Sequence, residues 1–248
     1  MQAKFNGSLQ FSVQDWSAWS PGRLGKSAWR NWAIGAPVEP AAAPEPTAKL
    51  PMQLKRRATR IGQKALEMAL AIPDADAAKM VVASRHGEYD HTVAILSSLA
   101  DREPVSPAEF SMSVHHGLAG LLSIHTGNRL GHVAVAAGID TFCNGLIEAA
   151  LCLAETPEIP VLLIYYDAPL PEAYAPFQDE SEAALPLAAA FLLRPCAETG
   201  LALHYHRSQA PERARENQAL AFLRLLLSDA ADAECQGEHM IWRWSRVH

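Results

Sequence analysis

An apolar strand that runs directly into an apolar helix constrains this sequence most. Residues 132–137, HVAVAA, are continuous in Val and Ala after a single histidine. From Cys143 to Ala154 apolar residues recur at helical spacing, and Glu148 and Glu155 are the only charged residues in or beside that segment. A helix with so few polar positions is typical of a buried element. The pair therefore predicts a helix nearly fully buried in the middle of the molecule, against a covered sheet.

Further apolar segments alternate with helical patterns along the 248 residues, as in α/β proteins. Strands are predicted at 9–19, 80–84, 132–137, 161–167, 201–208 and 239–247, with another apolar run at 187–194. Several are continuous in Val, Ile and Leu, which favours a mostly parallel central sheet of about five strands, covered by helices. We expect one domain over residues 1–248. The Pro- and Ala-rich segment 36–50 predicts a loop or surface arm, and segment 208–248 predicts only a helix and a strand.

Composition excludes several classes of protein. The hydrophobic fraction of 49% and charged fraction of 19% are those of a globular chain, and the net charge of −6 argues against nucleic-acid or anionic-membrane partners. No run of about 18 apolar residues predicts membrane insertion, so the cytoplasm is the expected location. The four cysteines include no CxxC pair, and neither a zinc ribbon nor a disulfide framework is indicated.

Cys143 is the residue with the most suggestive place in the pattern. It lies where the predicted helix begins, and a helix N-terminus lowers a thiol pKa and makes the thiolate a better nucleophile. Unpaired cysteine is also among the most often buried residues, so a small apolar packing role remains open. Cys152, Cys196 and Cys235 have no comparable context.

The histidines and the basic residues allow two interpretations each. His115 and His116 are adjacent and cannot face one metal from a helix, whereas His204 and His206 share a strand face. No third ligand is identifiable, so structural roles are favoured and no metal site is predicted. A basic cluster is either a solvated helix face or a surface for an acidic partner. It comprises Lys55, Arg56, Arg57 and Arg60.

Two longer motifs resemble a known family. SPAEFSMSVHHGLAGLLSI followed by GHVAVAAGIDTFCNGLIEAAL is similar to the N-terminal half of the β-ketoacyl synthases, which have the thiolase-like fold. Residues 140–146, DTFCNGL, fall on the family's Asp-Thr-Ala-Cys-Ser-Ser elbow, whose cysteine accepts the acyl chain. FSVQDWSAWSPG and VLLIYYDAPLPEAY further resemble truncated ketosynthase-like proteins of aryl polyene pathways, which act as chain-length-factor-like partners of a full ketosynthase.

Departures from the family pattern shape the functional expectation. The family's two catalytic histidine motifs, His-Gly-Thr-Gly-Thr and a later Gly-His, are absent, and Phe142 and Asn144 stand where small residues are usual. The resemblance therefore implies that Cys143 is no longer catalytic and that Phe142 and Asn144 border an acyl pocket. The alternative is a thioester acyltransferase that uses Cys143.

The resemblance also implies partners. A full-length β-ketoacyl synthase would form a heterodimer with this chain, and an acyl carrier protein would be reached through that complex. No cofactor is implied. In the family the strand before the elbow pairs with the same strand of the partner. Here that strand is His132, Val133, Ala134, Val135 and Ala136.

Overall fold

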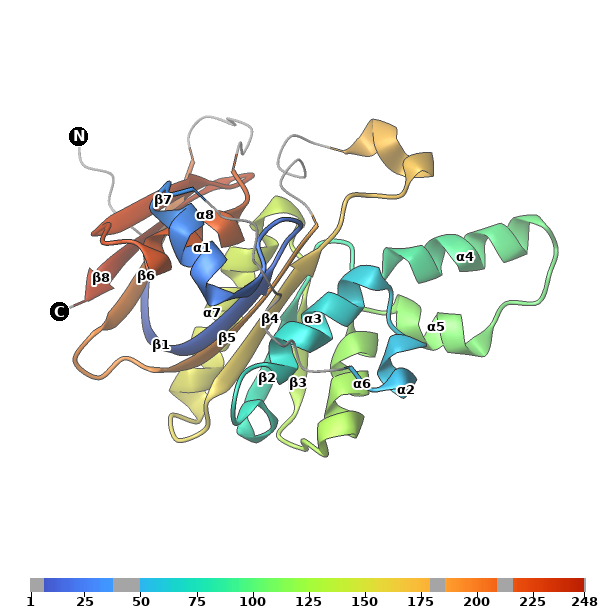
Figure 1. Cartoon of the computed structure of the whole chain (residues 1–248), viewed down its shortest axis with the longest axis horizontal. Coiled ribbons are helices and arrows are strands. Elements are labelled where there is room, and N and C mark those ends of the chain that lie inside the picture. Colours follow the sequence, from blue (N-terminus) through green and yellow to red (C-terminus); the bar gives the residue numbers. More distant parts are fainter. Residues whose placement is uncertain (1–6, 38–49, 179–185, 209–215, 248) are drawn as a thin grey trace.

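The computed structural model describes residues 7–37, 50–178, 186–208 and 216–247 of the chain. Most of the predicted arm at 36–50 and part of the segment 208–248 lie outside these residues. The described residues form one sheet with helices on both faces (Figure 1).

Eight strands of the described residues make up this sheet, in the order β3-β2-β4-β5-β1-β6-β8-β7. Their bounds are β1 Gly7–Trp19, β2 Lys79–Ala83, β3 His132–Val135, β4 Val161–Asp167, β5 Leu187–Pro195, β6 Gly200–Arg207, β7 Asp232–Gln236 and β8 Met240–Val247. The α-helices are α1 Gly25–Ala33, α2 Met52–Lys55, α3 Arg60–Leu70, α4 Tyr89–Ala100, α5 Pro107–Ser113, α6 His116–Thr126, α7 Thr141–Glu155 and α8 Gln218–Leu227. Short 3-10 helices are η1 Ala75–Ala77, η2 Gly138–Asp140 and η3 Glu172–Phe177.

The predicted class of covered α/β sheet is confirmed, but the prediction of a mostly parallel sheet of about five strands is wrong. Only β2 makes parallel pairs, with β3 and β4, and all other neighbouring strands are antiparallel. The continuous apolar run of β5 was the misleading signal. Burial on both faces produces such a run, and that burial does not depend on the direction of the strand.

Two hydrophobic cores lie on the two faces of the sheet. Along β4, Val161, Leu163 and Tyr165 enter the core that contains α7 and α8, and the intervening residues enter the core that contains α3 and α6. This alternation explains why every residue of β4 is buried. Figure 1 shows α3 and α6 over one face of the sheet and α7 behind it.

Helix α7 is the predicted helix after the elbow, and its buried residues pack on β2, β4 and β5. A Cβ atom added at Gly145 would lie 2.8 Å from Cβ of Ala83. The backbone of α7 therefore packs directly against side chains of β2 at this point. Burial is less complete than predicted, because Leu151 remains 52% exposed on the outer side of α7.

The C-terminal segment extends the sheet rather than forming a separate unit. Strand β8 pairs with β6, β7 pairs with β8, and α8 packs against α1, α7 and β7. None of the helices in the described ranges has the length and apolarity needed to cross a membrane.

Candidate functional site

The elbow between β3 and α7 brings Cys143 into the first turn of α7, directly after η2. Its side chain is 0% exposed. Its backbone N–H, one of the free donors of a helix N-terminus, donates to Oε1 of Gln218 on α8 over 3.2 Å. This first-turn donor is therefore already bonded within the chain.

A hydrogen-bond network centred on Asp140 closes the elbow. Its Oδ1 accepts the side-chain amide of Gln218 and the indole N–H of Trp242, both at 2.7 Å. Its Oδ2 accepts the backbone N–H of Glu238 at 3.1 Å. Gln218, Glu238 and Trp242 therefore cover the start of α7, although they lie 78 to 102 positions after Asp140 in the sequence. Nothing in the local pattern of the elbow predicts these contacts.

This enclosure keeps the Cys143 thiol out of contact with solvent. Burial raises the pKa of the Cys143 thiol well above its ordinary value, and the nearby Cys235 and Asp140 add to the increase. The helix N-terminus favours the opposite direction, but loss of solvent outweighs it here. Because the thiolate is the reactive form, burial here works against nucleophilic reactivity of Cys143.

Phe142 and Asn144 flank the cysteine in different surroundings. Phe142 is 1% exposed and its ring meets those of Tyr165, Phe191 and Phe222 at centroid distances of 5.4, 5.9 and 5.3 Å. Asn144 is partly exposed and its side-chain amide donates to the backbone carbonyl of Asp140 at 2.9 Å. Phe142 thus belongs to the aromatic core, while Asn144 remains within reach of the surface.

Strand β3 is an edge strand whose second side has no partner within the described chain. The carbonyls of Gly131 and Val135 accept bonds from β2. Because backbone groups alternate along a strand, those of His132, Ala134 and Ala136 point away from β2. All four residues of β3 are half-buried and Ala136 is exposed. We call residues 132–136 the edge strand.

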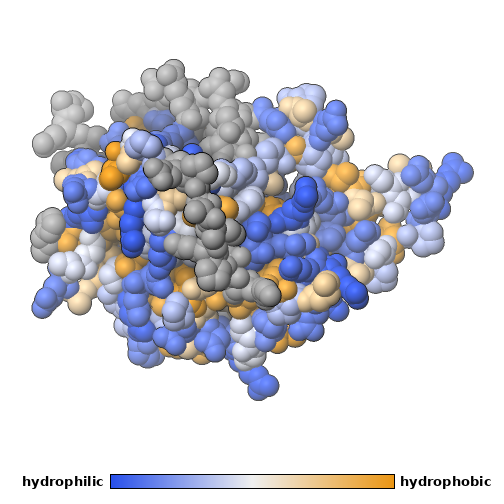
Figure 2. All heavy atoms as spheres, viewed as in Figure 1, coloured by the Kyte–Doolittle hydropathy of each residue, from blue (hydrophilic) through white to orange (hydrophobic). Residues whose placement is uncertain are grey.

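A helical hairpin, α4 with α5, projects away from the body of the molecule (Figure 1). We call residues 89–113 the α4–α5 hairpin. Helix α4 contains no buried residue although its sequence is largely apolar. Leu96, Leu99 and Phe110 are 46%, 57% and 64% exposed. Figure 2 shows apolar side chains toward the base of this projection and a hydrophilic tip. Apolar side chains exposed in this way mark an interaction surface.

The other residues singled out in the sequence do not assemble into a reactive centre. The ring of His116 lies 5.2 Å from that of His132, whose pKa is lowered by burial and then by His116. Nε2 of His204 lies 3.1 Å from Oγ of Ser245. No three His, Cys, Asp or Glu residues within the described ranges are arranged to hold a metal ion. Burial raises the pKa of Cys235 to about 12.

All four residues of the basic cluster are exposed: Lys55 ends α2, Arg56 and Arg57 lie in the turn that follows, and Arg60 begins α3. Figure 2 shows a broad hydrophilic area over α2 and α3. No acidic residue occurs between Glu45 and Glu67 in the sequence, so this area is locally basic in an acidic protein.

Comparison with known proteins gives results that agree with one another. The sequence matches the family model of the β-ketoacyl synthase N-terminal domain over residues 29–245. A search of curated proteins found no match. Among solved structures, the chain is similar to one chain of the complex between the ketosynthase ApeO and its chain length factor ApeC from Xenorhabdus doucetiae. That match has 32% identity and a TM-score of 0.82, and covers 96% of this chain and 99% of the other.

Two more distant structures share the fold. The ishigamide ketosynthase/chain length factor matches at 16% identity with a TM-score of 0.57, over 81% of this chain and 68% of the other. A complex of a type II PKS acyl-carrier protein with its ketosynthase, AntDE:AntF, matches at 12% identity with a TM-score of 0.69, over 97% of this chain and 99% of the other. The chain therefore belongs to the β-ketoacyl synthase N-terminal-domain family and has its thiolase-like fold.

Proposed function

We propose that this chain is a non-catalytic, chain-length-factor-like subunit that pairs with a full-length β-ketoacyl synthase in the cytoplasm, in aryl polyene biosynthesis. The observation that carries the proposal is the unpaired edge strand. A row of free backbone groups on an apolar strand is a template for pairing with another chain. The similarity to a ketosynthase–chain length factor complex supports a ketosynthase as this partner.

The α4–α5 hairpin supplies a second contact in this proposal. A projecting pair of helices with no buried residue in α4 gains little from folding unless another surface covers its apolar side chains. Leu96, Leu99 and Phe110 would be covered by the ketosynthase and would complete a wall of its acyl pocket. Asn144 would border the same pocket, with Phe142 setting its position from the aromatic core.

The sealed elbow supports a non-catalytic role over the acyltransferase alternative. A thioester enzyme needs an accessible thiolate, together with groups that stabilise the oxyanion. Here the thiol is buried, its pKa is raised, and the first-turn N–H that could serve an oxyanion is bonded to Gln218.

The test is co-expression with a full-length ketosynthase, followed by co-purification and analysis of product length. Ala134→Pro removes one outward N–H from the edge strand without removing a bond to β2. Ala134→Ser, of similar size, keeps that N–H and is the matched control. We expect Ala134→Pro to lose the partner and the full-length product, and Ala134→Ser to retain both. Products of equal rate and length without this chain would refute the proposal.

We further propose that an acyl carrier protein approaches the complex over the basic cluster, which fits an acidic protein surface. A solved complex of an acyl-carrier protein with its ketosynthase shares the fold, which supports a carrier protein as a further partner of the assembly. Arg56→Glu combined with Arg57→Glu should weaken carrier binding to the assembled complex and reduce its salt dependence. Carrier affinity unchanged by both substitutions would remove the basic cluster from the proposal.

A further inference from the structure

Helix α4 has no core contact that sets its direction. None of its residues is buried, and its main neighbour is α5, which belongs to the same projection. The direction in which the α4–α5 hairpin leaves the body must therefore be determined where it is attached. The hairpin has two attachments: α5 packs on α6 with Met112 in the core, and segment 84–91 joins the end of β2 to the first turn of α4. The second attachment is the one that contacts the start of α3.

Glu88 is the buried group at this attachment. Its side chain is 0% exposed. One carboxylate oxygen accepts the backbone N–H of Thr59 at 2.7 Å, and the other accepts the Thr59 hydroxyl at 3.0 Å. Thr59 is the N-cap of α3, and its Oγ1 accepts the backbone N–H of Gly62 at 3.2 Å. The carboxylate thus binds the N-terminus of α3, where free N–H groups and the helix dipole favour a negative charge.

The fit around this carboxylate is close at Gly62 of α3. A Cβ atom added at Gly62 would lie 2.2 Å from Oε1 of Glu88. Burial raises the pKa of Glu88, and the two bonds from Thr59 oppose that increase. A buried carboxyl, which is costly to desolvate, thus connects the N-terminus of α3 to the segment before α4.

Two further contacts brace the first turn of α4. Nε2 of His91 lies 2.9 Å from the backbone carbonyl of Arg57 and 4.0 Å from Oε2 of Glu88. The ring of Tyr89 meets that of Tyr174 in η3 edge to face, with centroids 5.3 Å apart. The base of α4 therefore contacts α3 on one side and the segment after β4 on the other.

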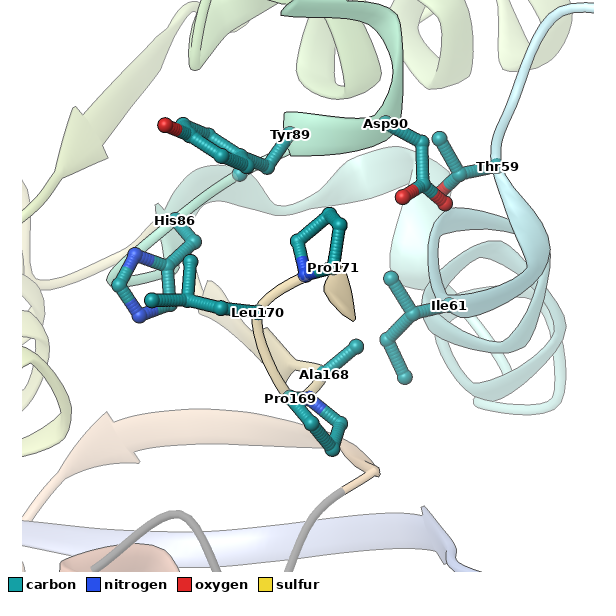
Figure 3. Close-up of a pocket in the computed structure, with 10 residues that line it drawn as sticks. Thr59, Ile61, His86, Tyr89, Asp90, Ala168, Pro169, Leu170 and Pro171 are labelled. Carbon is teal, nitrogen blue, oxygen red and sulfur yellow. The ribbon is translucent and has the colours of Figure 1, made fainter. Parts of the chain in front are cut away.

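Figure 3 shows the narrow pocket that these contacts leave, with Thr59 and Ile61 at the start of α3, Asp90 and Tyr89 of α4, and Pro171 between them. Its water-sized space is about 20 Å³, which is room for about one water molecule and too little for an organic ligand. The contact between the start of α3, the base of α4 and the segment after β4 is thus closely packed, with no space for an organic ligand. We call this contact the joint.

We propose that Glu88 is a positioning residue: by binding the N-terminus of α3 at Thr59, it sets the direction of the α4–α5 hairpin and so the geometry of the ketosynthase interface. The first half of this inference stands on the contacts of the isolated chain, and the second half rests on the proposed function. Glu88 is buried and acts on the interface only by fixing the position of the hairpin relative to α3.

Hydrogen exchange of the chain alone tests the first half. Glu88→Ala should accelerate exchange of residues 89–113 by about tenfold or more, because two bonds to a carboxylate are lost, while β4 keeps its protection. Glu103→Ala, the same change at an exposed carboxyl of the hairpin tip, is the matched control and should change neither. Unchanged exchange in the hairpin overturns the inference. If Glu88→Ala also accelerates hydrogen exchange in β4, the milder variant Glu88→Gln is measured. Equal acceleration of exchange in β4 and in the hairpin by Glu88→Gln also overturns the inference.

Reconstitution with the ketosynthase tests the second half. Glu88→Ala should weaken assembly about tenfold or more and broaden the distribution of product lengths, whereas Glu103→Ala should match the wild type. Wild-type affinity and an unchanged product distribution in Glu88→Ala would overturn the link from joint to interface. Failure of the wild-type chain to bind any ketosynthase would instead refute the proposed function and leave the exchange result standing.

Discussion

The indole N–H of Trp242 is the part of the elbow closure that can be removed with least change of shape. Trp242→Phe deletes the 2.7 Å bond to Oδ1 of Asp140 and leaves that carboxyl with Gln218 and Glu238 as donors. A hydrogen bond to a charged group contributes about 1.5–3 kcal/mol. At about 1.4 kcal/mol per factor of ten, the C-terminal segment should open roughly 10- to 100-fold more often.

Trp244 provides the control for this change. It lies on the same strand, is 0% exposed, and its buried Nε1 has no hydrogen-bond partner among the described residues. Trp244→Phe therefore removes the same ring atoms, next to Phe222, without breaking a hydrogen bond. The difference between the two variants isolates the bond to Asp140.

The assay is the rate of alkylation of Cys143 in the native chain, followed by mass spectrometry of its peptide. Because Cys143 is fully buried, reagent reaches it only when the segment above it opens. The partly exposed Cys196 reports reagent activity in the same sample. We expect Trp242→Phe to accelerate labelling of Cys143 far more than Trp244→Phe. Equal acceleration by both would show that packing, not the bond to Asp140, closes the elbow.

Three further predictions concern Cys143 and Glu88. Cys143→Ala should keep ketosynthase assembly and product formation, at a cost in unfolding free energy of about 1 kcal/mol, and loss of product in a normally assembled complex would establish a covalent role. Cys143→Trp should overpack the start of α7, lower stability by about 1–3 kcal/mol and weaken assembly in a pull-down titration. Burial raises the pKa of Glu88, so the folded chain binds its proton at higher pH than the unfolded chain and this group favours folding more as pH falls. The unfolding free energy of the wild type, relative to that of Glu88→Gln, should therefore increase as pH falls from neutral toward about pH 5. Parallel plots of unfolding free energy against pH for the two proteins would contradict this.

The parts of the fold that sequence predicts are those determined by local pattern. The apolar run of β4 follows from burial of all its residues, and the helix after the elbow follows from its largely apolar sequence. The start of α5 follows from Ser106 and Pro107, and the Ser106 hydroxyl accepts the backbone N–H of Glu109 at 3.4 Å.

The parts that escaped prediction depend on contacts between distant segments. Strand β7 has only one buried residue, Cys235, so its sequence carries no strand pattern and its pairing with β8 defines it. Gln218 and Trp242 approach Asp140 only after α8 and β8 have packed. The apolar residues of α4 give no sign in the sequence that the body of the chain leaves them uncovered.

The two edges of the sheet lead to the last prediction, because they differ in protection. At one end β7 exposes Asp232 and Glu234, and such charges discourage pairing with another chain. At the other end the edge strand is apolar apart from His132 and has no such charge. The chain purified alone should therefore self-associate through the edge strand in a concentration-dependent way. Ala136→Lys places a charge at an exposed position there, and should give a monomer in sedimentation analysis that no longer binds the ketosynthase. Ala231→Lys, at an exposed position directly before β7, is the control and should change neither property. A monomeric wild type, or an Ala136→Lys variant that still assembles normally, would contradict pairing through this edge.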